Sequence, residues 1–142
     1  MKRLFLDSSA LAKRYVKESG TERVLALLSN ADEVLLSVLA VPELISAFNR
    51  LRREKKISHG QYLSLKNSLA ADIPQATLID ISTAVIECAV RSLEEAPLRT
   101  LDALHIGSAI ISSADLFVSA DARQCESAEA MHLKVEHVGE QA

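Results

Sequence analysis

Short, continuous apolar runs, separated by segments with helical spacing, constrain the fold of this chain more than any other feature. Residues 3–7, 33–37 and 115–120 form runs of this kind. An unbroken apolar run is typical of a strand that is covered on both faces, as in a parallel sheet. Strands that alternate with helices build βα units with right-handed crossovers. The sequence therefore predicts an α/β fold with a mainly parallel central sheet and helices on both faces.

Two weaker runs bring the predicted sheet to about five strands, and helices fill the gaps. The expected strands are 3–7, 33–37, 76–81, 115–120 and 134–138, and the expected helices are 9–18, 21–30, 42–55, 58–72, 82–95, 100–113 and 122–131. Ser8 or Ser9 is expected to cap the first helix, with Asp7 as the alternative, and Thr100 to cap the sixth. A chain of 142 residues can bury a real core, so one domain, residues 1–142, is expected.

Composition excludes several classes of protein. Apolar residues make up 49% of the chain, which argues against disorder, and a net charge of −3 argues against a protein that coats nucleic acid. Cys88 and Cys125 lack zinc-site spacing and are expected to be reduced and packed. Asp7 interrupts the first apolar run too early for a signal peptide, and no run is long enough to span a bilayer.

Four acidic residues stand where an apolar run ends or a helix begins. Asp7 closes the first predicted strand, Asp121 follows the fourth, and Glu43 and Asp102 lie in the first turns of two predicted helices. Ligands bind beyond the carboxyl ends of the strands in an open parallel sheet, so these four side chains can share one crevice. Each acid taken singly is equally well explained as a helix cap or as a first-turn carboxylate that complements the helix dipole.

A cluster of four carboxylates requires a cation, because like charges a few ångströms apart strongly resist ionising together. Oxygen ligands alone select a hard divalent cation, Mg²⁺ or Mn²⁺. Such a cation neutralises phosphodiester oxygens and lowers the pKa of bound water, which makes hydroxide available near neutral pH. The four acids together therefore predict a metal-dependent site that cleaves phosphodiester bonds.

The order of these segments resembles the PIN domain, and within it the VapC-type toxins of toxin–antitoxin pairs. The matching segments are residues 5–11, 42–44, 101–105 and 118–123, and the resemblance covers essentially the whole chain. It implies a three-layer PIN-like fold and an endoribonuclease toxin that a cognate antitoxin holds inactive. It also implies a homodimer, a cytoplasmic location without a membrane segment, and a structured RNA substrate such as tRNA or rRNA.

The same resemblance implies a role for each acid. Asp7 and Asp102 would be the direct metal ligands, and Asp121 would bind a second metal ion or orient the water. Glu43 would ligate through water or act as general base, and these last two roles are interchangeable. The number of metal ions stays open.

Four further residues lie beside the acids in the sequence. Ser119 matches a hydroxyl residue of the family that can hold a carboxylate or a metal-bound water, and Ser9 is expected to do similar work near Asp7. Arg99 stands where the family often carries a basic residue, so phosphate contact and a solvated loop arginine are equally good interpretations. His105 shares a helix face with Asp102, and a packed, hydrogen-bonded histidine is favoured over a metal ligand.

One dense basic stretch, residues 50–56, contains Arg50, Arg52 and Arg53. It either contacts phosphate beside the crevice, where Lys13 would join it, or forms a solvated face that complements the helix dipole. With three Phe, two Tyr and no Trp, the chain has few platforms for base stacking. Recognition of a folded RNA by its shape and backbone is therefore expected.

Two other classes of protein remain as alternatives. An aspartyl phosphatase-like phosphotransferase would use Asp7 as its nucleophile, but such enzymes need a second Asp two residues on, where Ser9 stands. A non-catalytic PIN-like module that binds RNA or protein is expected to have lost part of the acid set, and all four acids are present. Metal-dependent cleavage of RNA would separate the nuclease from both alternatives.

Overall fold

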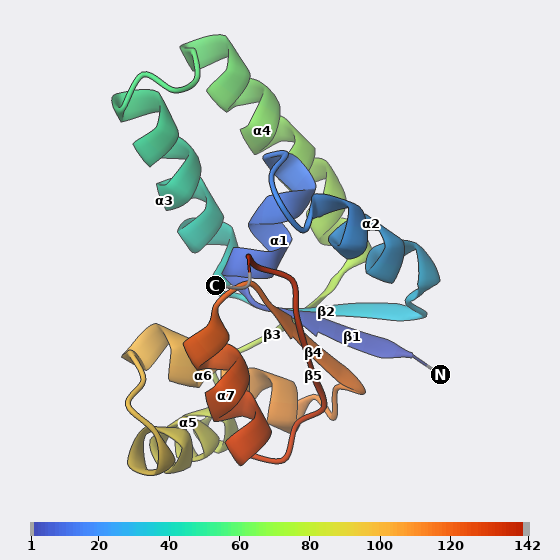
Figure 1. Cartoon of the computed structure of the whole chain (residues 1–142), viewed down its shortest axis with the longest axis vertical. Helices are drawn as coiled ribbons and strands as arrows, with labels where there is room; N and C mark the ends of the chain where they lie inside the picture. The colour runs from blue at the N-terminus through green and yellow to red at the C-terminus, as the bar shows by residue number, and fades with distance from the viewer. Residues whose placement is uncertain (1, 141–142) are drawn as a thin grey trace.

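Strands and helices alternate along the chain in the predicted order (Figure 1), in a computed structural model that describes residues 2–140. The elements are β1 (Arg3–Leu6), α1 (Ser8–Tyr15), α2 (Thr21–Asn30), β2 (Glu33–Ser37), α3 (Ala40–Arg53), α4 (His59–Asp72), η1 (Ile73–Gln75), β3 (Thr77–Ile79), α5 (Thr83–Glu95), α6 (Thr100–Ile111), β4 (Leu116–Ser119), α7 (Ala122–Ala130) and β5 (Val135–His137). The predicted single domain extends to Met1, Gln141 and Ala142, which lie outside the described residues. None of the helices within residues 2–140 is long and apolar enough to cross a membrane.

The five strands form one sheet in the order β3-β2-β1-β4-β5, and every neighbouring pair is parallel. The predicted sheet is therefore confirmed, and it is wholly rather than mainly parallel. From β1 the chain moves outward to β2 and β3, and then returns to place β4 on the other side of β1. The carboxyl ends of β1 and β4 consequently adjoin at the point where the strand order reverses, which is where ligands bind in folds of this kind.

Helices cover both faces of the sheet, which gives the three layers expected. Figure 1 shows α1 to α4 on one side of the strands and α5 to α7 on the other. Leu4 and Leu6 pack into the core on the first side, and Phe5 between them packs into the core on the second. Successive residues of a strand point to opposite faces of the sheet. All three side chains are fully buried because helices cover both faces.

Close packing of α6 against α5 fixes the helix that carries Asp102. A Cβ atom added at Gly107 would lie 2.6 Å from the carbonyl oxygen of Val85, so any side chain there would force the helices apart. The absence of a side chain at Gly107 is therefore what allows the two backbones to approach.

Cys88, on the α5 side of this contact, is buried and forms no disulfide within residues 2–140, and the same holds for Cys125 on α7.

Two helix caps differ from the first choice made from the sequence. Asp7, rather than Ser8 or Ser9, caps α1: its backbone is extended and its carboxylate accepts the N–H of Ala10. Ser8 is already the first helical residue, so its hydroxyl comes one position too late. The cap predicted at Thr100 is wrong for the same reason, because α6 begins at Thr100 and the capping position falls on Arg99, which makes no side-chain cap.

An ion-pair network joins α1 to the end of α4. Arg14 Nε lies 2.9 Å from Asp72 Oδ2, and the hydroxyl of Tyr15 donates to the same oxygen at 2.7 Å. The hydrogen bond from Arg14, helped by Tyr15 and opposed by partial burial, holds the pKa of Asp72 below its ordinary value. This contribution to stability is fully present above the ordinary pKa and is lost as the pH falls through the lower folded-state pKa.

We expect Asp72→Asn to lower the unfolding temperature near neutral pH, and to have no effect at a pH below both pKa values, where the wild-type carboxyl is protonated. Thermal unfolding across an acid pH series measures this difference, with Asp80→Asn at an exposed position as the matched control. A deficit of the same size at every pH would mean that Asp72 stabilises the protein by packing and not by its charge.

Candidate active site

Asp7 lies at the junction of the two central strands. Its backbone N–H donates to the carbonyl oxygen of Val118 in β4 at 3.1 Å, and its side chain is 5% exposed. Oδ1 accepts from the Ser9 hydroxyl at 2.7 Å and from the Ala10 N–H at 2.9 Å, and Oδ2 accepts from the Ser119 hydroxyl at 2.5 Å. Burial raises the pKa of Asp7, and these hydrogen bonds and the nearby charge of His105 offset only part of the rise. Ser9 and Ser119 thus both contact Asp7, in the placement expected from the sequence.

Ser119 links Asp7 to the loop that carries Asp121. The Ser119 hydroxyl, which donates to Asp7, accepts the backbone N–H of Asp121 at 3.0 Å. Asp121 caps α7, where its Oδ1 accepts the N–H groups of Arg123 at 2.9 Å and Gln124 at 3.4 Å. The capping role noted for Asp121 in the sequence is therefore real, and within residues 2–140 its second oxygen makes no hydrogen bond.

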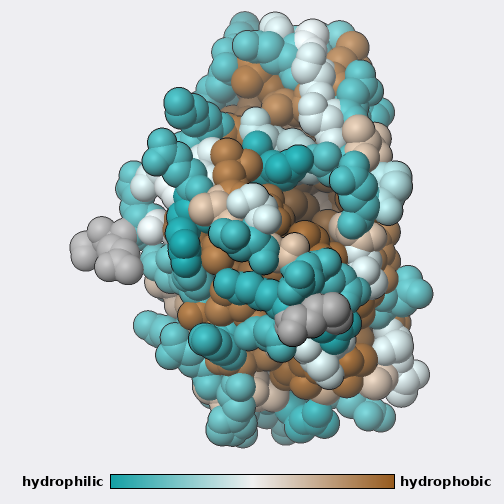
Figure 2. Space-filling view, turned by 90° about the vertical axis from the view of Figure 1, so that its right-hand side faces the viewer, coloured by the Kyte–Doolittle hydropathy of each residue, from teal (hydrophilic) through white to brown (hydrophobic). Residues whose placement is uncertain are grey.

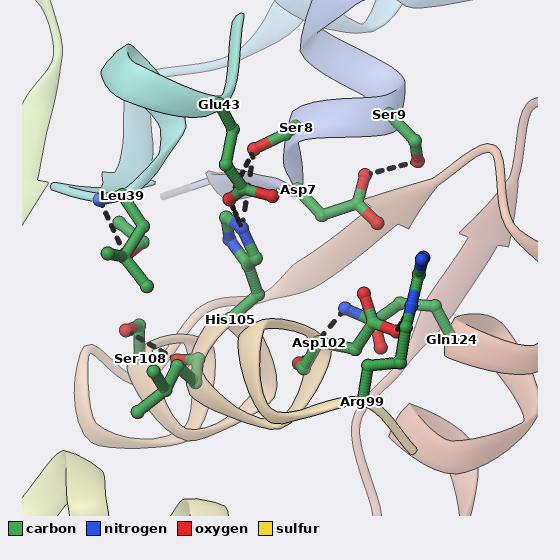
Figure 3. A network of polar contacts seen from close by, with 12 residues as sticks. Asp7, Ser8, Ser9, Leu39, Glu43, Arg99, Asp102, His105, Ser108 and Gln124 are labelled. Carbon is green, nitrogen blue, oxygen red and sulfur yellow. Dashed lines mark hydrogen bonds and ion pairs between the residues drawn. The ribbon is translucent and has the colours of Figure 1, made fainter. Parts of the chain in front are cut away.

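Glu43 is half-buried in the first turn of α3, where Ser8 and His105 reach it. The Ser8 hydroxyl donates to Glu43 Oε1 at 2.9 Å, and His105 Nε2 lies 2.6 Å from the same oxygen (Figure 3). Burial pushes the pKa of Glu43 upward, but these two hydrogen bonds and the charges of His105 and Arg99 outweigh it and hold the pKa below its ordinary value. Glu43 is therefore a carboxylate near neutral pH.

Asp102 lies in the first turn of α6, across from Asp7. Figure 3 shows the two carboxylates on facing sides of the same space, with Arg99 beside Asp102. Arg99 Nε is 3.4 Å from Asp102 Oδ2, but the Arg99 side chain is 83% exposed, so this pair is weak. Gln124 of α7 is buried and donates from Nε2 to the backbone carbonyl of Asp102 at 3.1 Å, which fastens this turn of α6 to α7.

The four predicted acids lie at one edge of the sheet, but their side chains do not surround a single metal position. Among residues 2–140, no three His, Cys, Asp or Glu side chains converge tightly enough to hold a metal ion. Asp7 has both oxygens in hydrogen bonds to neutral groups, but each carboxylate oxygen has a second lone-pair direction that can meet a cation. The four acids offer only oxygen donors, and within residues 2–140 every group that donates a hydrogen bond to Asp7 is neutral, so the residues present fit a hard divalent cation.

Sequence reasoning missed two members of this group. Ser8 was considered only as a helix cap, and its contact with Glu43 depends on a fold-level approach of α1 to α3 that no local pattern reveals. Gln124 did carry a signal, because it is a polar residue beside Cys125 on the buried side of α7. His105 is packed and hydrogen-bonded as the sequence favoured, but its partner is one of the four acids.

The basic candidates for RNA contact lie in three different settings. Lys13 is 6% exposed and its Nζ donates to the Ser19 carbonyl at 2.6 Å and to Glu18 at 3.1 Å, which favours a structural role. Arg99 is exposed beside the acids. The stretch from residue 50 to 56 lies at the far end of α3 from Glu43, at the tip of the α3–α4 hairpin (Figure 1).

Arg52 is engaged within that hairpin. Its guanidinium donates to Asn49 at 2.6 Å, lies 3.0 Å from His59 Nδ1, and stands over the Tyr62 ring at 4.5 Å. Arg50 and Arg53 are exposed. Of the three arginines, these two therefore have side chains directed to solvent, where a phosphate can reach them.

An apolar cleft of about 300 Å³ lies apart from the acids. It is bounded by α1, α2, the start of β2 and η1, and Arg14 and Asp72 stand among its lining residues. Figure 2 views the molecule from the side of α2 and shows hydrophobic side chains gathered between hydrophilic ones. The cleft is near the amino ends of the strands, whereas the acids stand at the carboxyl ends.

Comparisons with known proteins agree with this architecture. The family model of the PIN domain matches residues 4–130. Among solved structures, FitAcB from Neisseria gonorrhoeae superposes with a TM-score of 0.73 at 18% identity, covering 93% of this chain and 95% of that chain. VapBC2 from Rickettsia felis, bound to a DNA fragment from its promoter, gives 0.70 at 16% identity and covers 95% and 98%. VapC20 from Mycobacterium tuberculosis, a Sarcin-Ricin loop cleaving toxin, gives 0.64 at 15% identity and covers 87% and 94%.

These identities show a shared fold, and no match was found among curated protein sequences. The family model, in contrast, covers most of the chain, including all four acids. The resemblance read from the sequence is thereby confirmed at the level of the family: the chain belongs to the PIN domain family.

Proposed function

We propose that this protein is a metal-dependent endoribonuclease that acts as the toxin of a toxin–antitoxin pair. The observation that carries the proposal is the state of Asp7. It is a buried carboxylate at the strand-order reversal, it faces Asp102, and within residues 2–140 all its hydrogen-bond donors are neutral. Burial raises the pKa of Asp7 and so disfavours its ionised form, and a cation beside the carboxyl would reverse that effect, which supports a metal ion at this place.

Asp7 and Asp102 would hold the metal ion, Mg²⁺ or Mn²⁺, from opposite sides of the space between them. When bound, the ion supplies charge stabilisation for the phosphodiester and lowers the pKa of a bound water. Asp121 has one oxygen free of its capping bonds, with which it would bind a second ion or orient the water. Glu43, held as a carboxylate by Ser8 and His105, would ligate through water or accept the proton of the attacking water.

A folded RNA is the proposed substrate, a tRNA or rRNA. All three Phe side chains are fully buried, Tyr62 is 7% exposed and Tyr15 packs against Phe48, so the surface offers almost no aromatic ring for base stacking. Recognition then depends on RNA shape and backbone. One solved relative, VapC20, is described as cleaving the Sarcin-Ricin loop, which is the kind of structured target meant here.

A cognate antitoxin and a second copy of the chain are the proposed protein partners, in the cytoplasm, where such RNAs are found. The support comes from the solved relatives, one of which is described as a toxin–antitoxin complex from Klebsiella pneumoniae and another as a member of a family of toxin–antitoxin systems from Mycobacterium tuberculosis. Purification of the chain expressed together with a candidate antitoxin tests the first partner, and the mass of the free chain in solution tests the second.

The function itself is tested by sequencing RNA 5′ ends after brief expression in a growth-sensitive host. Hydrolysis that expels the ribose 3′ oxygen leaves a 5′-phosphate, so the new ends ligate directly to an adaptor. We expect cuts concentrated at one structured site in one RNA species. Growth arrest without new 5′-phosphate ends would contradict a nuclease and favour a module that only binds.

Charge at the tip of the α3–α4 hairpin gives a separate expectation for RNA binding. Replacing Arg50 and Arg53 by Gln is expected to weaken binding and to reduce the salt slope of log K by about 1 to 2, because fewer counterions are released. Affinity for Mn²⁺ should not change, since both residues lie remote from the acids.

The matched control replaces Lys2 and Lys134, exposed lysines at the amino ends of β1 and β5, by Gln. This control removes the same charge from the opposite edge of the sheet. An equal loss of salt slope in both double variants would assign the effect to net charge, and an unchanged slope in the arginine variant would assign the tip to a solvated face.

A further inference from the structure

Two side chains donate hydrogen bonds to the same carboxylate oxygen of Glu43. The Ser8 hydroxyl and His105 Nε2 both reach Oε1, at 2.9 and 2.6 Å, and they lie 3.3 Å from each other. Within residues 2–140, Oε2 makes no hydrogen bond. Because a carboxylate only accepts hydrogen bonds, Nε2 of His105 must carry the proton that it shares with Oε1. This arrangement fixes the rotation of the carboxylate and leaves Oε2 as its one free oxygen.

The surroundings of His105 are poorly suited to a histidine that serves only as packing. The ring is 2% exposed and meets the Phe5 ring edge-on at 6.2 Å. Its second nitrogen, Nδ1, is buried and has no hydrogen-bond partner in the described part of the chain. A buried nitrogen without a partner disfavours histidine at this place, and an apolar side chain of similar size would avoid that penalty. What favours histidine here must therefore be the bond made by Nε2.

We infer that His105 is a positioning residue of the active site, which holds Glu43 so that Oε2 faces the space between Asp7 and Asp102. Figure 3 shows His105 reaching from α6, the helix of Asp102, to Glu43 on α3, with Asp7 at the start of α1 beside them. One hydrogen bond of His105 thus connects α6, which carries Asp102, to Glu43 on α3. This inference rests on the proposed function, because it supposes that Glu43 serves a metal ion or its water.

The chemistry expected of such a residue is known from metal sites in general. Partners that orient a ligand without touching the metal change metal affinity by roughly 10- to 100-fold when they are removed. We expect His105→Leu, which keeps the apolar volume and removes the donor, to weaken Mn²⁺ binding by about 10-fold. His105→Gln places an amide N–H near the position of Nε2 and should restore affinity to within about 3-fold of the wild type, since it restores the bond that orients the ligand.

The experiment is a calorimetric titration of Mn²⁺ into chelator-treated protein, with circular dichroism to show that each variant is folded. Wild type and Asp7→Asn are included to establish that the measured site is the acid cluster. Glu43→Gln and the double variant of Glu43→Gln with His105→Leu complete a thermodynamic cycle. If His105 acts through Glu43, His105→Leu costs no further affinity in the Glu43→Gln background.

Failure of the positioning role and failure of the proposed function give different results in this experiment. Wild-type affinity in folded His105→Leu, or an undiminished His105→Leu effect in the Glu43→Gln background, would overturn the positioning role while leaving the proposed nuclease intact. If His105→Leu does not fold, His105→Gln tests the positioning role instead. A folded His105→Gln protein that binds Mn²⁺ 10-fold more weakly than the wild type would also overturn that role. Failure of the wild type itself to bind Mn²⁺ would instead count against the proposed function.

Discussion

Asp7→Asn is expected to abolish RNA cleavage while leaving the protein folded. The change keeps the size of the side chain, and an amide oxygen can still cap α1 and accept from Ser9, so the local structure survives. What is lost is the ionisable, buried carboxyl group that faces Asp102. Removing a single group that stabilises a transition state costs on the order of 10²- to 10³-fold in rate, and a direct metal ligand should cost at least that much.

The measurement is the initial rate of cleavage of the target RNA at saturating Mn²⁺, with circular dichroism to verify folding. Asp115→Asn is the matched control, because Asp115 precedes β4 at the opposite edge of the sheet and accepts the backbone N–H of Arg3 at 2.7 Å. An amide oxygen can keep that bond, so activity should be almost unchanged. A folded Asp7→Asn protein that still cuts RNA would remove Asp7 from the site.

Divalent metal is expected to raise the unfolding temperature substantially. A cation held by the proposed acid cluster would bind the folded protein and hardly bind the unfolded chain, where the four residues are far apart. At about 100 times Kd, linkage stabilises the fold by roughly 2.7 kcal/mol. At about 3 °C per kcal/mol for a domain of this size, the unfolding temperature should rise by roughly 8 °C. Mn²⁺ should act at a lower concentration than Mg²⁺, because its affinity for most ligand sets is higher.

Asp102→Asn tests whether this shift comes from the acid cluster. The substitution removes one of several mutually repelling charges, and the only ion pair it breaks within residues 2–140 is the weak one with Arg99. The metal-free protein should therefore unfold at the same or a higher temperature, and the response to metal should be blunted. Thermal unfolding across a Mn²⁺ titration after chelation measures both quantities. An equal response in wild type and variant would place the cation elsewhere.

Most of the fold followed from the sequence because the relevant signals are local. A run such as Leu4–Leu6 places apolar side chains on both faces of a strand, which is expected only where both faces are covered. The polar residue Asp7 then marks the end of the strand. Parallel pairing then brings all strand ends to one edge, so the approach of Asp7 to Ser119 and Asp121 could be foreseen without coordinates. The order of the four acid-bearing segments carried the resemblance to the PIN domain, and the family model confirmed the family.

The remaining features depend on contacts between distant segments. Lys13 looked like a free cation on a helix, but the turn at Ser19 folds back over it and takes its ammonium. Arg52 looked like part of a solvated run, but Tyr62 and His59 of the next helix enclose it. The meeting of Ser8 with Glu43 spans two helices whose relative position is set by packing alone. No periodicity in the sequence encodes such contacts.

The place of β4 beside β1 also determines when the protein can become active during its synthesis. β1 is made first, but its neighbour on one side is β4, near the end of the chain, which ends at Ser119 and is followed by Asp121. A nascent chain that stops before Leu116 leaves β1 as an unpaired edge and Asp7 without its hydroxyl partner from β4. If the protein is the proposed nuclease toxin, its activity should therefore begin only when the chain is finished or nearly finished, and only then would an antitoxin be needed.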